Sequence, residues 1–122
     1  MNFFEWSRPR QKGDPPYYIY PATEPAFRMA GLWDEWTDPE TGEVVLSCTT
    51  ITCEPNEFMS DIHDRMPVII GADQLDGWFK APPEEAVNML KPCPSEWLSA
   101  RKVSSYVNNT RNQGPDCVEP ED

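Results

Sequence analysis

The stretch FRMAGLWDEWTDPETGEVVLSCTTIT, residues 27–52, decides the expected fold. Its two ends, residues 27–33 and 43–52, are rich in aromatic and β-branched side chains, which favour β-strands. Between them lies DEWTDPETGE, residues 34–43, where a proline and a Thr-Gly pair are typical of a turn. We therefore predict that the two ends pair as the strands of one antiparallel hairpin.

Short strands and short helices are predicted on both sides of this hairpin. Aromatic and aliphatic runs predict further strands at residues 3–6, 17–20, 67–70 and 101–107. Helices are indicated by a proline and acids in a first turn, or by apolar residues three and four apart, at residues 54–62, 72–79 and 82–90. Together these elements predict an α+β protein with an antiparallel, barrel-like β-sheet core and short peripheral helices.

Composition and charge narrow the class of protein. A chain of 122 residues has the length of one domain, and its 14 prolines favour a fold rich in loops and short elements. There are 21 acidic residues against 10 Lys and Arg, giving a formal charge of −11. Because phosphate contacts need a basic surface, this charge argues against broad nonspecific binding to nucleic acid.

Location and cofactors are inferred from what the sequence lacks. No secretory leader and no apolar run near the ~18 residues of a membrane span is visible, so we expect a soluble, cytoplasmic protein without a membrane partner. Cys48, Cys53, Cys93 and Cys117 lie too far apart for a CxxC pair, and with one histidine they make a poor zinc set. We expect free structural thiols, no metal and no cofactor.

Both ends of the chain carry expectations about domain boundaries. A core-type aromatic strand begins almost directly after Met1, where termini usually fray, so the chain is expected to start within a domain and to lack its N-terminal half. From residue 113 onward the sequence holds four acids and no base. Residues 113–122 are therefore expected to form a disordered acidic tail behind a domain of residues 1–112.

The block FFEW, residues 3–6, places Glu5 between aromatic side chains. A carboxylate that is partly desolvated by Phe4 and Trp6 has a raised pKa, which suits general acid or base catalysis. The alternative is a solvent-facing strand residue, because alternation along a strand sets Glu5 opposite Phe4 and Trp6. From this block alone, the alternative is the stronger interpretation.

The block DIHDRMP, residues 61–67, holds His63, the single histidine, and Arg65. In an extended segment these two side chains share a face, which would allow the arginine to bind a phosphate while the imidazole transfers a proton. The alternative is an imidazole paired with a flanking aspartate and an arginine in a surface ion pair. VNNTRN, residues 107–112, either closes a polar site or forms a surface turn, and its asparagines favour the turn.

The order of the motifs resembles one known family. FFEW, PYYIYPA, FRMAGLWDEW, TTITCEPNEFMSDIHDRMPVII, a helix with a tryptophan and VSSYVNNTRN follow one another as in the C-terminal part of the SOS-response-associated peptidase (SRAP) family, the abasic-site-processing proteins. The resemblance covers residues 3 to about 112. Its most specific motifs are the aromatic-Glu-Trp block, the Thr-rich strand that leads into a short acidic helix, and IHDRMP.

This resemblance implies a function and a mechanism. Family members bind single-stranded DNA and capture abasic sites through a cysteine directly after the initiator methionine. Its α-amine forms a Schiff base with the sugar aldehyde, and its thiolate closes a thiazolidine ring. The family is also described as a peptidase, because the cysteine must be freed from what precedes it.

Residue by residue, the resemblance assigns roles to five positions. Glu5 matches the catalytic glutamate and would move protons during Schiff-base formation or ring closure. His63 matches the active-site histidine and would protonate the sugar oxygen. For DNA binding, Arg65 matches an arginine that contacts phosphate, Thr52 a threonine near the site, and Trp6 a residue at the DNA-facing cleft. Base stacking and local basic contacts would allow binding despite the acidic total.

One departure from the family pattern weighs against activity. Residue 2 is Asn2, and none of the four cysteines lies near the N-terminus. Two hypotheses follow. The first is a DNA-repair enzyme of the abasic-site type, with hydrolase and lyase-type chemistry, which is inactive as this chain alone. The second is a non-catalytic fragment that binds single-stranded DNA or complements a separate N-terminal half.

Overall fold

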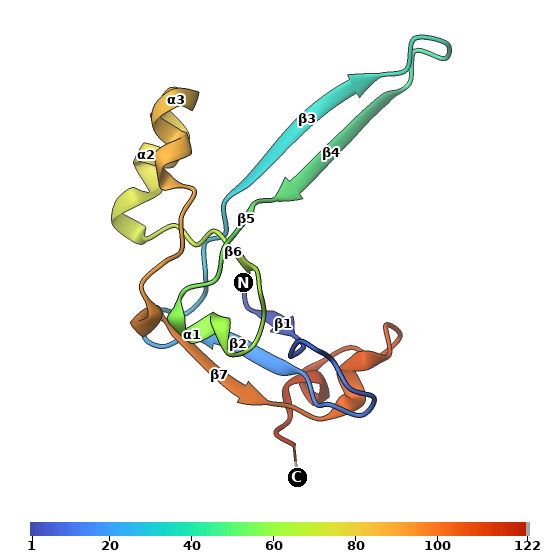
Figure 1. The fold of residues 1–122 in the computed structure, drawn as a ribbon. Coiled ribbons are helices and arrows are strands. Elements are labelled where there is room, and N and C mark those ends of the chain that lie inside the picture. Colours follow the sequence, from blue (N-terminus) through green and yellow to red (C-terminus); the bar gives the residue numbers. More distant parts are fainter. Residues whose placement is uncertain (122) are drawn as a thin grey trace.

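The computed structural model describes residues 1–121 and confirms a mixture of antiparallel sheets and a few short helices (Figure 1). The first sheet has the order β1 (Phe3–Glu5), β2 (Tyr17–Pro21) and β7 (Leu98–Lys102); the second pairs β3 (Gly31–Thr37) with β4 (Val44–Thr50); the third pairs β5 (Thr52–Cys53) with β6 (Met66–Pro67). The helices are α1 (Glu57–Ser60), α2 (Leu75–Lys80) and α3 (Pro83–Ala86). None of the helices in this part of the chain combines the length and the apolarity that crossing a membrane requires.

The predicted barrel-like closure is not seen in residues 1–121. Closing a barrel requires every strand to have two neighbours. Within the described residues, β3 and β4 pair only with each other, and the β5–β6 sheet is two residues long on each side. The three sheets therefore remain separate.

The core lies between the β1-β2-β7 sheet and the segment around β6. Ile19 of β2, Met59 of α1 and Val68, directly after β6, are fully buried. The run predicted as a strand at residues 67–70 is indeed buried, but only its beginning pairs with β5, and Ile69 makes an isolated bridge with Met29. The buried cluster consists of Ile19, Phe27, Ala30, Cys53, Met59, Ile62, Met66, Val68, Ile69, Ile70, Cys93 and Leu98.

The predicted antiparallel hairpin is present, with its first strand shifted along the chain. The register of β3 and β4 runs from Gly31 opposite Thr50 to Thr37 opposite Val44. Residues 34–36, expected in the turn, belong to β3. The pairing with β4 continues as far as Thr37 opposite Val44, so the turn comprises only residues 38–43. Asp38 caps it by accepting the backbone N–H of Glu40 at 2.8 Å. Figure 1 shows the hairpin projecting from the rest of the chain, and every residue of both strands is exposed.

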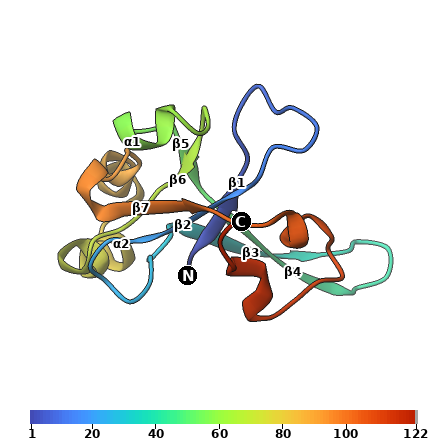
Figure 2. The same cartoon turned by 90° about the horizontal axis from the view of Figure 1, so that it is seen from below.

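The C-terminal segment is packed, in contrast to the disordered tail expected for residues 113–122. Pro115–Val118 form a 3₁₀ turn, Cys117 is buried, and Val103 bridges to Pro120. Figures 1 and 2 both show this segment (red) next to the end of β7. Backbone pairing of this kind does not depend on the acidic side chains; residue 122 lies outside the described residues.

The late strand also differs from its prediction at residues 101–107. β7 covers Leu98–Lys102, and Ser105–Asn108 form a 3₁₀ turn instead. The hydroxyl of Ser104 starts this turn by accepting the backbone N–H of Tyr106 at 3.4 Å. Serine and asparagine favour such local hydrogen bonds over a strand ladder, and the turn brings Asn108 towards β1.

Candidate functional site

Glu5 ends β1, and the alternation of that strand sets its direction. The ring of Phe3 lies 6.0 Å from that of Phe27 in the core, whereas Phe4 lies on the other face, 5.3 Å from Tyr18. The two-residue period of a strand puts Glu5 on the side of Phe3. Its side chain is only 23% exposed, so the carboxylate stands at the edge of the core and not in open solvent.

A capped helix fixes the position of His63. At the start of α1, Oδ1 of Asn56 accepts the backbone N–H of Met59 at 2.9 Å, while its Nδ2 donates to the carbonyl of Cys93 at 2.9 Å. At the end of the helix, the backbone N–H of His63 donates to the carbonyl of Met59 at 2.8 Å. The imidazole therefore follows directly after a closed turn, and it is 10% exposed.

Glu5 and His63 meet although the sequence separates them. Nε2 of His63 lies 3.4 Å from Oε1 of Glu5. On the other side of the ring, Nδ1 accepts the backbone N–H of Arg65 at 3.1 Å, which requires a lone pair on Nδ1. In the tautomer in which Nδ1 accepts this bond, the proton of the neutral imidazole lies on Nε2, on the side of the Glu5 carboxylate.

The protonated imidazole has partners as well. Oδ1 of Asp64 lies 3.2 Å from Nδ1 of His63, so an imidazolium stands between the carboxylates of Asp64 and Glu5. The carbonyl oxygen of Arg65 is a further neighbour of Nδ1, at 3.2 Å. Both charge states of the ring therefore have neighbours that can accept or donate a hydrogen bond, an arrangement that general acid–base chemistry can use.

The β5–β6 pair joins Arg65 to Thr52. Nη2 of Arg65 donates to the carbonyl of Thr52 at 2.9 Å and to its hydroxyl at 3.0 Å. Both residues are exposed, and Thr52 stands opposite Pro67 in the register. These bonds hold the guanidinium at the surface beside β5, and its planar fork is a group that binds phosphate oxygens.

Trp6 is placed by a contact with a distant part of the chain. Its indole Nε1 donates to Oδ1 of Asn108 at 2.8 Å, and the guanidinium of Arg10 lies 5.3 Å from the centre of its ring. The sequence interpretation of residues 107–112 favoured a surface turn. The turn is present, and through Asn108 it also contacts Trp6, the residue directly after β1.

Sequence reasoning missed Arg8 as a neighbour of the site. Its Nη1 lies 3.4 Å from Oδ1 of Asp64, and its backbone N–H donates to the carbonyl of Ile62 at 3.2 Å. Both charged side chains are exposed, so the ion pair contributes little to stability. Arg8 nevertheless connects the loop between β1 and β2 to the loop that carries His63. No periodic signal in the polar run of residues 7–16 pointed to this contact.

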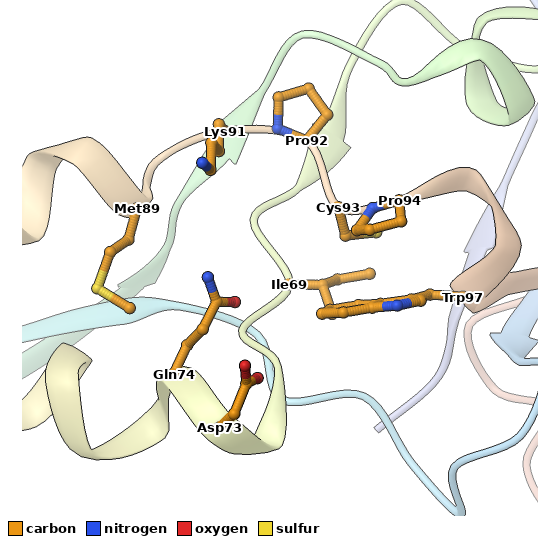
Figure 3. A pocket seen from close by; sticks show the side chains of 9 residues that line it. All are labelled: Ile69, Asp73, Gln74, Met89, Lys91, Pro92, Cys93, Pro94 and Trp97. Carbon is orange, nitrogen blue, oxygen red and sulfur yellow. The ribbon is translucent and has the colours of Figure 1, made fainter.

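The largest cavity near a cysteine offers no reactive thiol. Figure 3 shows Cys93 beside Pro94 and Trp97 in a cavity of about 480 Å³. Burial raises the pKa of the Cys93 thiol to about 11, so at neutral pH it stays protonated and is a poor nucleophile. All four cysteines are free, as predicted. Residues 1–121 hold no group of three His, Cys, Asp or Glu arranged to bind a metal ion.

Comparisons with known proteins match most of the chain to one family. The family described as SOS response associated peptidase (SRAP) matches residues 1–110. The abasic site processing protein YoqW of Bacillus subtilis is 37% identical over 121 residues, which are 97% of this chain and 54% of YoqW. The abasic site processing protein HMCES of Gallus gallus is 34% identical over 140 residues, covering 97% of this chain and 41% of that protein.

A solved structure has the same fold. The crystal structure of a protein from Bacteroides thetaiotaomicron superposes with a TM-score of 0.85 at 30% sequence identity. The superposition covers 98% of this chain and 53% of that one. This chain therefore spans about half the length of the bacterial relatives that it matches.

Proposed function

This chain belongs to the SOS response associated peptidase (SRAP) family, and from that premise we propose that it acts on abasic sites in single-stranded DNA through Glu5 and His63. Relatives that are named abasic site processing proteins match 97% of the chain. The observation that carries the proposal is the 3.4 Å contact between Nε2 of His63 and Oε1 of Glu5. This contact joins a side chain from the FFEW block to one from the DIHDRMP block, and both side chains are largely buried.

The chemistry of an abasic site needs such a pair. The sugar exists as a closed ring and as an open aldehyde, and opening requires a proton on the ring oxygen. Attack of an amine on the aldehyde then requires protons to leave the nitrogen and to reach the departing water. We assign the proton that reaches the ring oxygen to the imidazolium form of His63. The Glu5 carboxylate, which lies beside Nε2 of His63, is assigned the acceptance of the proton from the anomeric hydroxyl and the later transfers.

Contact with DNA is assigned to Trp6, Thr52 and Arg65. Trp6 offers an aromatic face for stacking of a base, with the Arg10 guanidinium 5.3 Å from its ring centre. Arg65, held by Thr52, offers its guanidinium to a phosphate. A local group of arginines is sufficient for such contacts although the whole chain carries a charge of −11.

Covalent capture is proposed for the whole family domain and not for this chain alone. The resemblance implies a cysteine directly after the initiator methionine, whereas residue 2 here is Asn2, whose Nδ2 donates to the hydroxyl of Tyr18. The α-amine of Met1 donates to the carbonyl of Phe27 at 3.1 Å. The 122-residue chain is therefore expected to bind abasic DNA reversibly. Thiazolidine formation, and peptidase or lyase-type activity, would require the remainder of the domain.

A second candidate function is supported by the exposed hairpin and by the length of the match. The chain would be a non-catalytic fragment that complements a separately encoded half of the domain. The match to 54% of YoqW leaves room for such a second half. The exposed strands β3 and β4 offer a surface for it.

Fluorescence anisotropy with a labelled single strand that carries one abasic site, or none, tests the proposed function. We expect the chain to bind the abasic strand more tightly and to leave no adduct on a denaturing gel. Glu5→Gln and His63→Gln are expected to remove the preference, whereas Asp61→Asn, at an exposed position of the same loop, keeps it. Equal binding of the two strands by the unaltered chain would contradict the proposal.

A further inference from the structure

The loop between β1 and β2, residues 7–16, is a positively charged segment of an acidic chain, and we call it the basic loop. It holds Arg8, Arg10 and Lys12 against one acid, Asp14. Three positive charges less one negative charge leave +2, whereas the whole chain carries −11. All three basic residues are exposed. Charges more than about 8 Å apart are largely screened at physiological ionic strength, so remote acids contribute little to the potential at this loop.

The tip of the basic loop is a hydrogen-bonded turn. The backbone N–H of Gln11 donates to Oδ2 of Asp14 at 2.8 Å, and the backbone N–H of Asp14 donates to the carbonyl of Gln11 at 3.2 Å. Between them, Gly13 has a φ of 98°, a conformation that glycine adopts without strain. The carboxylate of the loop is therefore bound within the turn, while Lys12 lies exposed at the tip.

Arg8 attaches the basic loop to the segment that carries His63. Its backbone N–H donates to the carbonyl of Ile62 at 3.2 Å, and its Nη1 lies 3.4 Å from Oδ1 of Asp64. Ile62 and Asp64 are the two neighbours of His63 in the sequence. Figure 2 shows the loop (blue) next to this segment (green). The positive charge of the loop is thereby held on the same side of the molecule as the candidate site.

Arg10 connects the basic loop to the residue assigned to base stacking. Its guanidinium lies 5.3 Å from the centre of the Trp6 ring, a distance at which the ring attracts a cation. Trp6 directly follows Glu5 in the sequence. A strand whose base stacks on Trp6 carries a phosphate on each side of that nucleotide. An arginine beside the stacking ring is therefore placed to contact the strand next to the base.

The composition of the basic loop selects the class of polyanion. An anionic membrane binds segments that add an apolar face to their basic residues. Apart from prolines, residues 7–16 contain no aliphatic or aromatic side chain that could enter a bilayer. A nucleic-acid backbone needs no such face, because its affinity comes from neutralised phosphates. The loop is therefore suited to a nucleic-acid strand.

We propose that the basic loop is a phosphate-binding arm for single-stranded DNA. Arg10 and Lys12 contact phosphates of the nucleotides that flank the candidate site, and Arg8 keeps the arm attached beside His63. The inference rests on the proposed function and adds a second group of phosphate contacts to that of Arg65. Because phosphate contacts carry no information about the base, the arm is expected to bind undamaged and abasic strands alike.

Anisotropy titrations over a range of salt concentrations, with an undamaged and an abasic single strand, test the arm. Arg10→Gln with Lys12→Gln is expected to lower the affinity for both strands by the same factor. It should also reduce the slope of log affinity against log salt by about 1.4, which is about 0.7 for each phosphate contact. Lys80→Gln with Lys91→Gln is the matched control, because it removes two positive charges at exposed positions outside the loop. Equal changes of slope from the two double variants would overturn the proposal, since net charge alone would then explain them.

The same titrations separate failure of the arm from failure of the proposed function. If the unaltered chain binds both strands equally and the loop variant reduces the slope, the abasic-site function fails and the arm is supported. If the abasic strand is preferred and the loop variant leaves the slope unchanged, the arm is overturned and the function is not. Absence of binding to both strands would overturn both.

Acetylation of lysine side chains, followed by mass spectrometry, locates the bound strand without any substitution. Lys12 is expected to react several-fold more slowly when an undamaged single strand is present, whereas Lys80 and Lys91 react at unchanged rates. Equal protection of the three lysines, or no protection of Lys12, would overturn the proposal. Protection of Lys12 by vesicles of anionic phospholipid and not by the strand would also overturn it, because the loop would then bind a membrane.

Discussion

The β1-β2-β7 sheet and the β3–β4 hairpin consist of similar residues but differ in their surroundings. Ile19 in β2 is fully buried beneath the segment around β6, whereas Trp33 in β3 is 76% exposed. Both strands have the aromatic and aliphatic composition that favours β-structure. The difference teaches that composition specifies a strand, whereas burial depends on which other segment of polypeptide packs against it.

This division of the chain separates the candidate site from the β3–β4 hairpin. Glu5 and His63 are positioned by β1 and by the end of α1, both anchored in the buried cluster. The hairpin contributes none of the contacts described for the Glu5–His63 pair. We therefore expect changes in the hairpin to leave the geometry of this pair intact, and the following predictions test that separation.

The largest difference is expected between two truncations of aliphatic side chains. Ile19→Ala removes a fully buried side chain and is expected to lower the free energy of unfolding by about 2–5 kcal/mol. Leu46→Ala, on the hairpin, is expected to change it by at most about 0.5 kcal/mol. Urea denaturation of the 122-residue chain measures both values. Equal losses would show that the hairpin is part of the core.

The junction of the two regions is sensitive to a single methyl group. A Cβ at Gly31 would lie 2.8 Å from the carbonyl oxygen of Thr49, so Gly31→Ala is expected to cost about 1–3 kcal/mol as the strands move apart. Gly77→Ala in α2 is the control, since its nearest atom would be 3.8 Å away and alanine favours a helix. Circular dichroism during urea titration compares the two. If Gly31→Ala leaves the free energy of unfolding unchanged, the strands β3 and β4 can move apart at Gly31 without cost.

An arginine beside the candidate site should affect DNA binding without affecting stability. Arg65→Gln is expected to weaken binding of single-stranded DNA and to reduce the slope of log affinity against log salt by about 1, because one phosphate contact is lost. Arg111→Gln, another exposed arginine, serves as the control. Anisotropy titrations at several salt concentrations give both slopes. If Arg65→Gln and Arg111→Gln change the affinity and the salt slope equally, Arg65 makes no specific contact with a DNA phosphate.

The smallest expected effect is a pH dependence of the hairpin turn. The backbone N–H of Glu40 and the side chain of Thr41 hold the pKa of Asp38 below its usual value of 3.8. Since the folded carboxyl has the lower pKa, its contribution is fully present above pH 3.8 and is lost as the pH falls through the folded value. Tryptophan fluorescence from Trp33 and Trp36 should therefore change in acid. Asp38→Asn is expected to abolish that change, and its persistence in the variant would assign it to another group.

The sequence predicted best those elements whose structure depends on neighbouring residues in the chain. The pairing of β3 with β4 followed from two β-rich runs around a turn, and α1 followed from a proline and acids near its start. The convergence of Glu5 and His63 was expected from the family resemblance, and the structure places them 3.4 Å apart. Their catalytic roles remain predictions.

The remaining features depend on contacts between distant segments, which local patterns do not encode. The acidic C-terminal segment is ordered by backbone bonds such as that from Ser104 to Glu119, at 3.1 Å. The contact of Asn108 with Trp6 connects the two ends of the chain. Barrel closure was predicted from strand content alone, but it requires neighbours for β3 and β4 that residues 1–121 do not provide.

The most direct test of the central claim is nitrogen-resolved NMR of the imidazole of His63, which is unambiguous because the chain has one histidine. In the free protein, the neutral ring is expected to carry its proton on Nε2. Addition of a single strand with an abasic-site analogue is expected to shift the ring signals to saturation, while an undamaged strand leaves them nearly unchanged. A neutral ring protonated on Nδ1, or the same response to both strands, would contradict the account.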